Sequence, residues 1–226
     1  MSIYKKEKMC ELLKPLGEFR YDDIDTIRRF LTESEDSERK KLKLELEKLG
    51  VPKKDADNGS FFERLSIEFD EYLLSETHEL SHELVTMALY KKIELRIHRI
   101  LTVAYPYEDL RHMYRHTHLK KFLGCHNISL MTLLHYNELN ELRHVNNSIK
   151  HGGVVSGPLS KFPGWQVGGP LENLDKCYER ISLLMPIFVE DLVSKVESDV
   201  GCYTSPSPRL TNHSSRPAPP VAEFNR

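Results

Sequence analysis

The sequence of 226 residues predicts an all-α protein. Apolar residues recur at every third or fourth position in residues 61–101, 128–153 and 171–196, which is the period of an amphipathic helix. A segment rich in glycine and proline, residues 152–170, separates the last two of these stretches. Together these observations predict a helical bundle interrupted by one irregular loop.

Residues 1–56 are predicted to form an N-terminal helical extension. Helices are expected over Asp22–Leu31 and Glu35–Leu49, and the second begins with acidic residues and ends near Lys48, which suits the helix dipole. A polar segment starting at Val51 is predicted to be a linker. Two interpretations remain open, namely a helical hairpin packed on the main domain or a separate module that binds a partner.

The main domain is predicted over residues 57–200. A long helix is expected over 61–101, with a break near Ser75 as one option, and its buried side is marked by apolar residues at four-residue steps. A short histidine-rich helix at 109–122, the helix at 128–153 and a last helix at 171–196 follow. The segment around Trp165 is predicted to be an ordered loop or small hairpin, and residues 201–226, rich in Ser and Pro, to be a disordered tail. The predicted buried side of the first helix is Val85, Leu89, Ile93, Ile97 and Ile100.

Composition excludes several classes of protein. The formal net charge of −2 does not favour nucleic-acid binding over the whole surface, so any such site must be a local patch. The four cysteines have no C-x-x-C spacing, which argues against a zinc ribbon or a disulfide framework. No run of residues is apolar enough for a membrane span, and the N-terminus lacks the apolar centre of a signal peptide. We therefore expect a cytoplasmic protein without membrane association and without a cofactor.

The predicted helix at 128–153 has two faces of different character. Its polar face carries a ridge at four-residue steps, Arg143, Asn147 and His151, and the helix should end at Gly152 and Gly153. Further polar side chains close to the ridge are Tyr136, Asn140, His144 and Lys150. The opposite, core-facing stripe is Leu130, Leu134, Leu142, Val145 and Ile149.

An imidazole and a guanidinium on one ridge suit cleavage of RNA without a metal ion. His151 would transfer a proton near neutral pH, and Arg143 would neutralise the charge that develops on the phosphorane. Asn147 would orient one of these groups or hold a phosphate. The alternative is a polar helix face that meets only solvent or a dimer partner.

The run E-L-R-H-V-N-N-S-I-K-H-G-G, preceded by A-L-Y-K-K-I-E-L-R-I-H-R-I-L on an earlier helix, resembles the HEPN superfamily over about residues 61–196. That family is a helical bundle marked by an arginine and a histidine four to six residues beyond it, whereas seven residues separate Arg143 from His151 here. The resemblance implies a homodimeric, metal-independent endoribonuclease, often a toxin restrained by an antitoxin or a component of phage defence. It also implies supporting roles for His144 and Glu94. A non-catalytic HEPN-like module that binds a protein or nucleotide remains the alternative.

Two other patterns could carry function. The histidine-rich segment forms a local basic patch that could bind RNA, and within it the family spacing recurs from Arg111 to His116. His78-Glu79-Leu80-Ser81-His82 spells H-E-x-x-H, the motif of zinc peptidases, with the two histidines as metal ligands and Glu79 as the base. The alternative for this pair is two histidines near the buried helix face. The RNA-binding candidates are Arg111, Arg115, His116, Lys120 and Lys121.

Overall fold

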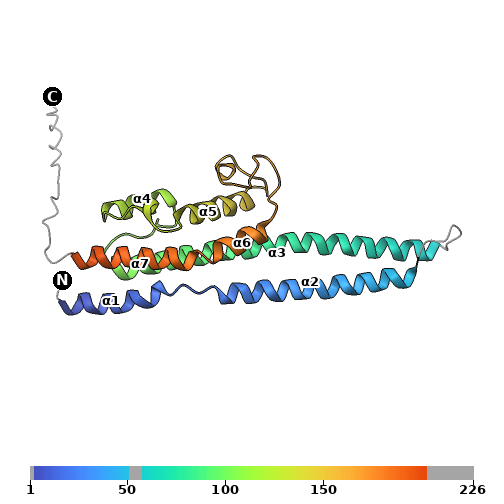
Figure 1. Ribbon diagram of the computed structural model, residues 1–226, viewed down its shortest axis with the longest axis horizontal. Coiled ribbons are helices and arrows are strands. Elements are labelled where there is room, and N and C mark those ends of the chain that lie inside the picture. Colours follow the sequence, from blue (N-terminus) through green and yellow to red (C-terminus); the bar gives the residue numbers. More distant parts are fainter. Residues whose placement is uncertain (1–2, 51–57, 203–226) are drawn as a thin grey trace, which may run out of the picture.

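The protein is all-α, as predicted. The computed structural model describes residues 3–50 and 58–202 (Figure 1), and the predicted C-terminal tail and most of the predicted linker lie outside these ranges. The only β-type pairing within the described residues is a bridge between Val154 and Pro170. The elements are α1 (Ile3–Gly17), α2 (Asp22–Leu49), α3 (Asn58–Ala104), α4 (His116–Cys125), η1 (Leu130–Thr132), α5 (Tyr136–Lys150), η2 (Leu159–Lys161), α6 (Leu174–Ser182) and α7 (Met185–Cys202).

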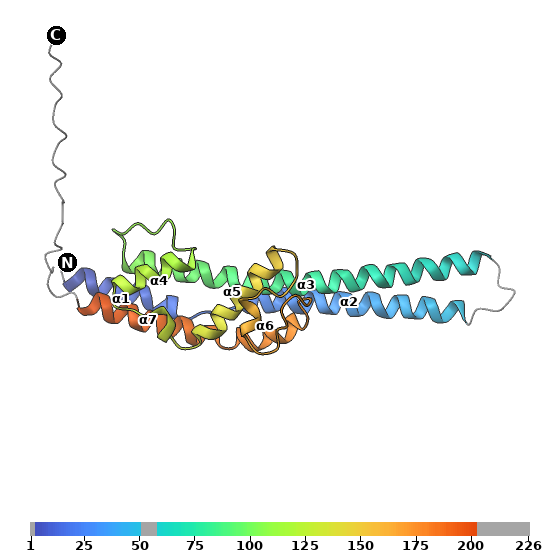
Figure 2. The ribbon, with the colours of Figure 1, turned by 90° about the horizontal axis from the view of Figure 1, so that it is seen from above.

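Helix α3 is the axis of the molecule. Its 47 residues run unbroken through Ser75, whose hydroxyl donates to the carbonyl of Glu71, so no break occurs there. In its inner half, α1, α7, α5 and α6 pack around it. Its outer half pairs with α2, and the two helices extend beyond the rest of the bundle as a hairpin (Figures 1 and 2). Only the inner half of α3 therefore lies in a core that is covered from several sides.

The core is built from the apolar faces of these helices. Every α3 residue predicted to be buried is at most 5% exposed, which confirms the periodicity argument. Leu13 of α1 and Ile24 of α2 also lie in this core, so the first fifty residues share it with the main bundle. Helices α1 and α2 therefore contribute to the same apolar core as α5 and α7.

Three predicted helix boundaries were wrong. A single helix, α2, replaces the predicted pair at 22–31 and 35–49, because Thr32 is accommodated by donating to the carbonyl of Arg28. The predicted helix at 109–122 begins only at His116, since the Asp109 carboxylate binds the amide of Arg111 and holds this segment in turns. The predicted last helix is divided into α6 and α7.

The predicted helix at 128–153 also starts later than expected. His135 adopts a left-handed conformation with φ of 58° and separates η1 from α5. Leu134, predicted to face the core, is 54% exposed, and its amide donates to Asp191 of α7 instead of to a helical carbonyl. The helix does end where the glycines predicted it, at Lys150.

The Gly-rich segment is an ordered loop that folds back on α5, as predicted. The amide of Val155 donates a hydrogen bond of 2.8 Å to the carbonyl of Gly169 across it. The indole Nε1 of Trp165 donates to Glu141 Oε1 over 2.8 Å, and Arg180 of α6 donates to the same oxygen over 2.7 Å. A single buried carboxylate on α5, that of Glu141, thus holds both the Gly-rich loop and helix α6.

Candidate functional site

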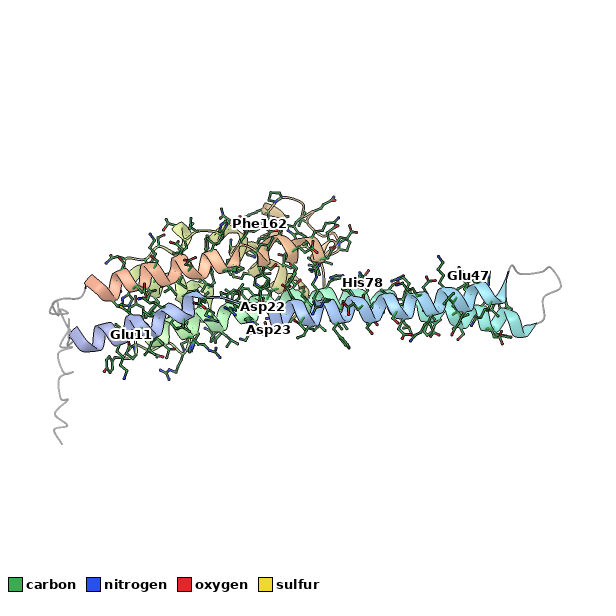
Figure 3. All side chains as sticks on the ribbon, turned by 60° about the horizontal axis from the view of Figure 1, so that its bottom comes forward. Glu11, Asp22, Asp23, Glu47, His78 and Phe162 are labelled. Atoms are coloured by element: carbon green, nitrogen blue, oxygen red, sulfur yellow. The ribbon has the colours of Figure 1, made fainter. Side chains whose placement is uncertain are left out.

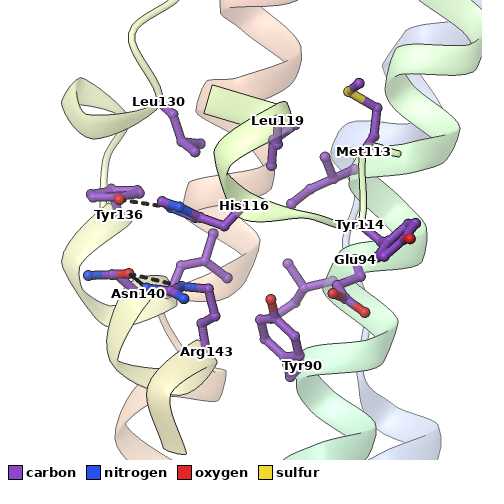
Figure 4. A pocket seen from close by; sticks show the side chains of 13 residues that line it. Tyr90, Glu94, Met113, Tyr114, His116, Leu119, Leu130, Tyr136, Asn140 and Arg143 are labelled. Atoms are coloured by element: carbon purple, nitrogen blue, oxygen red, sulfur yellow. Dashed lines mark hydrogen bonds between the residues drawn. The ribbon is translucent and has the colours of Figure 1, made fainter. Parts of the chain in front are cut away.

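A pocket between α3, α4 and α5 gathers five of the polar side chains singled out above, namely Glu94, His116, Tyr136, Asn140 and Arg143 (Figure 4). We call it the Arg143 pocket. It encloses about 460 Å³ including its open mouth. Its lining residues are Tyr90, Ile93, Glu94 and Ile97 of α3, Met113 and Tyr114 of the preceding turns, His116 and Leu119 of α4, Leu130 of η1, and Tyr136, Leu139, Asn140 and Arg143 of α5.

Arg143 is held in place by its own helix. Its Nε and Nη2 atoms donate to Asn140 Oδ1 over 3.1 and 2.8 Å, one helical turn earlier. Nη2 also lies 2.6 Å from Nε2 of His144, which must accept this hydrogen bond because a guanidinium has no acceptor. The side chain is part-buried, so the guanidinium is oriented before any ligand arrives.

His116 enters the pocket from the first residue of α4. Its Nε2 atom lies 3.0 Å from the hydroxyl of Tyr136 on α5, and the two rings are 6.1 Å apart (Figure 4). Helix α4 therefore brings a second imidazole to the same pocket as Arg143. His116 was expected to lie in a basic, RNA-facing segment, and its place beside the central helix was not predicted.

The electrostatics of the pocket keep both imidazoles neutral. Burial, the charge of Arg143 and that of Lys120 lower the pKa of His116. Burial, followed by the charges of Arg143, His116 and Lys161, lowers the pKa of His144 to about 4. A neutral imidazole can accept a proton at neutral pH, so the pocket combines one fixed cation, Arg143, with one unprotonated base, His116, while the neutral His144 binds Arg143 from outside the pocket.

Tyr90 and Glu94 line the α3 side of the pocket. Burial and the neighbouring Glu94 carboxylate raise the pKa of Tyr90, which therefore stays protonated and can donate a hydrogen bond. Burial likewise raises the pKa of Tyr136, against the effect of the Arg143 charge. Glu94 is itself paired with Lys91 over 3.3 Å. Tyr90 was missed by the sequence analysis, although it lies one turn before Glu94 on the same face of α3.

The predicted ridge does not converge on this pocket. His151 follows the last residue of α5, is exposed, and is not among the pocket-lining residues. The helix ends before the third step of the ridge, so His151 does not continue the line from Arg143. Asn147 is half-buried outside the pocket, and Lys150 is exposed. Arg143 is paired with His144 instead, the residue next to it in sequence.

The basic segment lies beside the pocket without forming one continuous patch. Arg111 is bound to the Asp109 carboxylate by two hydrogen bonds, of 2.9 and 2.7 Å. The Arg115 guanidinium lies over the ring of Tyr114, at 5.6 Å from its centre. Lys120 and Lys121 are exposed on α4. Lys120 and Arg115 thus remain as exposed cations close to His116.

The H-E-x-x-H segment lies on the α2–α3 hairpin, where Figure 3 labels His78, and none of its residues lines the Arg143 pocket. The Nε2 atoms of His78 and His82 are 3.1 Å apart, and His78 Nδ1 contacts the buried carboxylate of Glu35 on α2. Glu79 is exposed. Within residues 3–50 and 58–202, no group of three or more His, Cys, Asp or Glu side chains is placed to hold a metal ion.

Comparison of the chain with protein-family models, with curated proteins and with solved structures gave no match. Among the described residues, no helix combines the length and apolar character needed to cross a membrane.

Proposed function

We propose that the protein is an endoribonuclease whose catalytic centre is the Arg143 pocket. The supporting observation is the meeting of one fixed guanidinium with a neutral imidazole, His116, in one pocket. RNA carries its own nucleophile, the 2′-hydroxyl, so its cleavage needs a base and a cation more than it needs a nucleophile from the protein. This proposal keeps Arg143 in the role expected from the sequence and assigns the base to His116 in place of His151.

In this mechanism the His116 imidazole accepts the proton of the 2′-hydroxyl as the oxygen attacks the adjacent phosphorus. Arg143 binds the non-bridging oxygens and stabilises the phosphorane. The bond from phosphorus to the 5′-oxygen then breaks, the leaving oxygen takes a proton from water, and the products are a 2′,3′-cyclic phosphate and a 5′-hydroxyl. Tyr90 can donate a further hydrogen bond to the same oxygens. His144 acts as a positioning residue, because it binds Arg143 and does not line the pocket.

The test is cleavage of a labelled single-stranded RNA in EDTA, with DNA of the same sequence as substrate control. We expect Arg143→Ala and His116→Gln to lower the rate at least about 100-fold, the range for a lost acid–base group. His118→Gln, an exposed histidine on the same helix, and His151→Gln should retain wild-type activity. Loss of activity in His151→Gln with retention in His116→Gln would contradict the assignment of the base.

A second candidate is a module that binds a phosphate or nucleotide without cleaving it. The orientation of Arg143 favours this candidate, because Asn140 and His144 hold its guanidinium in place and such a guanidinium binds a phosphate whether or not an ester bond is cleaved. It predicts RNA or nucleotide binding that is lost in Arg143→Ala, no cleavage by the wild type, and no cyclic phosphate product.

Two further expectations from the HEPN resemblance stay proposals, namely a homodimer and a toxin held inactive by an antitoxin. Light scattering of the purified protein tests the first. The second predicts that expression of the wild type slows bacterial growth, whereas Arg143→Ala does not, at equal protein levels.

A further inference from the structure

The outer half of α3 carries a row of large apolar side chains that no part of the described chain covers. They are between 44 and 65% exposed, although Leu and Phe of this size are among the residues most often buried. We call this row the apolar stripe. Its members are Phe62, Leu65, Phe69, Leu73, Leu80 and Leu84.

The stripe occupies one face of the helix, directed away from α2. Its residues follow one another at steps of three, four or seven, which keeps them on one side of an α-helix. His78 contacts Glu35 and so marks the side of α3 that faces α2. Phe69 lies nine residues before His78, a rotation of about two and a half turns, and therefore points to the opposite side.

The stripe is long enough to bind another helix. From Phe62 to Leu84 it extends about 33 Å at 1.5 Å per residue. Scattered exposed apolar residues are ordinary, but six of them aligned on one helix face over this length mark an interaction site. Helix α3 needs only one apolar face to pair with α2, so the stripe is a second apolar face that the hairpin does not use.

The same face of α3 is already covered further along the chain. At steps of three and four residues the stripe continues through Met87 to Tyr90 and Glu94, which line the Arg143 pocket beneath α5. Near the junction, a Cβ atom on Gly153 would lie 4.0 Å from Glu83 Oε1, so the loop after α5 reaches the inner end of the stripe. The bare stripe thus continues the α3–α5 interface beyond the end of α5.

We propose that the apolar stripe docks one amphipathic helix of another protein, with an apolar seam flanked by Lys and Arg. The charge on this half of α3 specifies that chemistry. Residues 58–84 contain seven carboxylates and a single basic residue, Arg64. Glu76, Glu79 and Glu83 lie within or beside the stripe by their helical positions, so cations on the partner would pair with them.

A second copy of this chain is a poorer occupant. Two stripes packed face to face would bring Glu76 and Glu79 of one molecule close to the same acidic helix of the other, and such like-charge contacts oppose association. The partner helix therefore differs in charge from the outer half of α3. Because the stripe ends beside the loop that follows α5, the inner end of the bound helix would meet that loop.

The experiment uses two fluorescein-labelled synthetic helices with the same leucine seam, one flanked by Lys and one by Glu, and measures anisotropy with the full-length protein at low salt. We expect the Lys helix to bind at least tenfold more tightly than the Glu helix. Leu80→Ser should weaken its binding at least fivefold. Leu12→Ser is the matched control and should leave the binding unchanged, because Leu12 lies on α1 and is as exposed as Leu80, at 54% against 53%.

Charge is tested separately with Glu76→Gln/Glu79→Gln, which should reduce the preference for the Lys helix. Equal binding of both helices, or equal binding by Leu80→Ser and wild type, would overturn the proposal. A dimer that Phe69→Ser dissociates in light scattering would overturn it in favour of a second copy. The assay contains no RNA, so its outcome is independent of whether the Arg143 pocket cleaves RNA.

Discussion

Arg143 donates a hydrogen bond to the imidazole of His144, the next residue in the chain, across 2.6 Å. The contact requires a neutral His144, because a protonated ring has no acceptor and would place two cations side by side. Burial and three neighbouring cationic or imidazole groups hold the pKa of His144 at about 4, so the contact persists at neutral pH. Protonation of one side chain would therefore release the guanidinium from one of its two partners.

The first prediction concerns stability in acid. His144 binds a proton near pH 6.5 in the unfolded chain but only near pH 4 in the folded one, so the unfolded state holds more protons between these values. Stability must then fall as the pH falls through this interval. His144→Asn, which keeps an acceptor for Arg143, should lose less stability between about pH 7 and pH 4.5, measured by urea unfolding. His118→Asn should behave as wild type, and an unchanged pH dependence in His144→Asn would contradict the assignment.

The second prediction concerns the pH dependence of RNA cleavage. His116 must be unprotonated to act as a base, so kcat/KM should rise with pH and then reach a plateau. The midpoint of this rise should lie below pH 6.5, because the pKa of His116 is lowered. Lys120 contributes to this lowering. Lys120→Met should therefore move the midpoint to higher pH, whereas Lys121→Met on the same helix should leave it in place. A midpoint above 6.5 in the wild type would exclude His116 as the base.

The third prediction concerns the carboxylate that holds the Gly-rich loop. Glu141→Ala leaves the Trp165 indole and Arg180 without their common acceptor and should destabilise the fold by about 2–4 kcal/mol. Trp165 is the only tryptophan, so its fluorescence reports directly on the loop. Glu172→Ala, an exposed residue following the same loop, serves as the control and should change neither stability nor the emission spectrum.

The fourth prediction concerns the end of α5. Gly152 has φ of 112°, which a residue with a Cβ atom adopts only under strain, so Gly152→Ala should cost about 1–3 kcal/mol in urea unfolding. Gly157 has no positive φ and open space around its Cβ position. Gly157→Ala should therefore stay within about 0.5 kcal/mol of wild type. Equal effects of the two substitutions would show that the backbone conformation at Gly152 does not limit stability.

Sequence periodicity predicted the fold class and the buried face of α3 because both depend on local spacing. The break before α5 depends on a distant residue instead. Leu130 and Leu134 have helical spacing, but Asp191, 57 residues later, captures the amide of Leu134. The division of the predicted last helix into α6 and α7 is indicated by a local feature of the sequence, a proline. Pro186, which lacks an amide hydrogen, favours a new helix start close to Met185.

The candidate site was predictable only in part. Helical spacing placed Tyr136, Asn140 and Arg143 near one another, the HEPN resemblance implied a supporting role for Glu94, and all four line one pocket. His116 was not expected there, because its approach to Tyr136 depends on how α4 folds back across twenty residues of chain. Helical spacing can place side chains on a face, but it does not indicate which neighbouring element covers that face.

Helix α3 spans about 70 Å at 1.5 Å per residue and has unequal protection along its length. Amides near Leu89 and Ile93 lie in the central core, so their hydrogen exchange should require global unfolding. Among the described residues, amides near Phe62 and Phe69 are supported only by α2, so fraying of the hairpin is enough to expose them to exchange. One continuous helix thus contains a rigid segment and a readily opened one. A ligand that slows hydrogen exchange only near Phe62 and Phe69 must therefore bind at the outer end of α3.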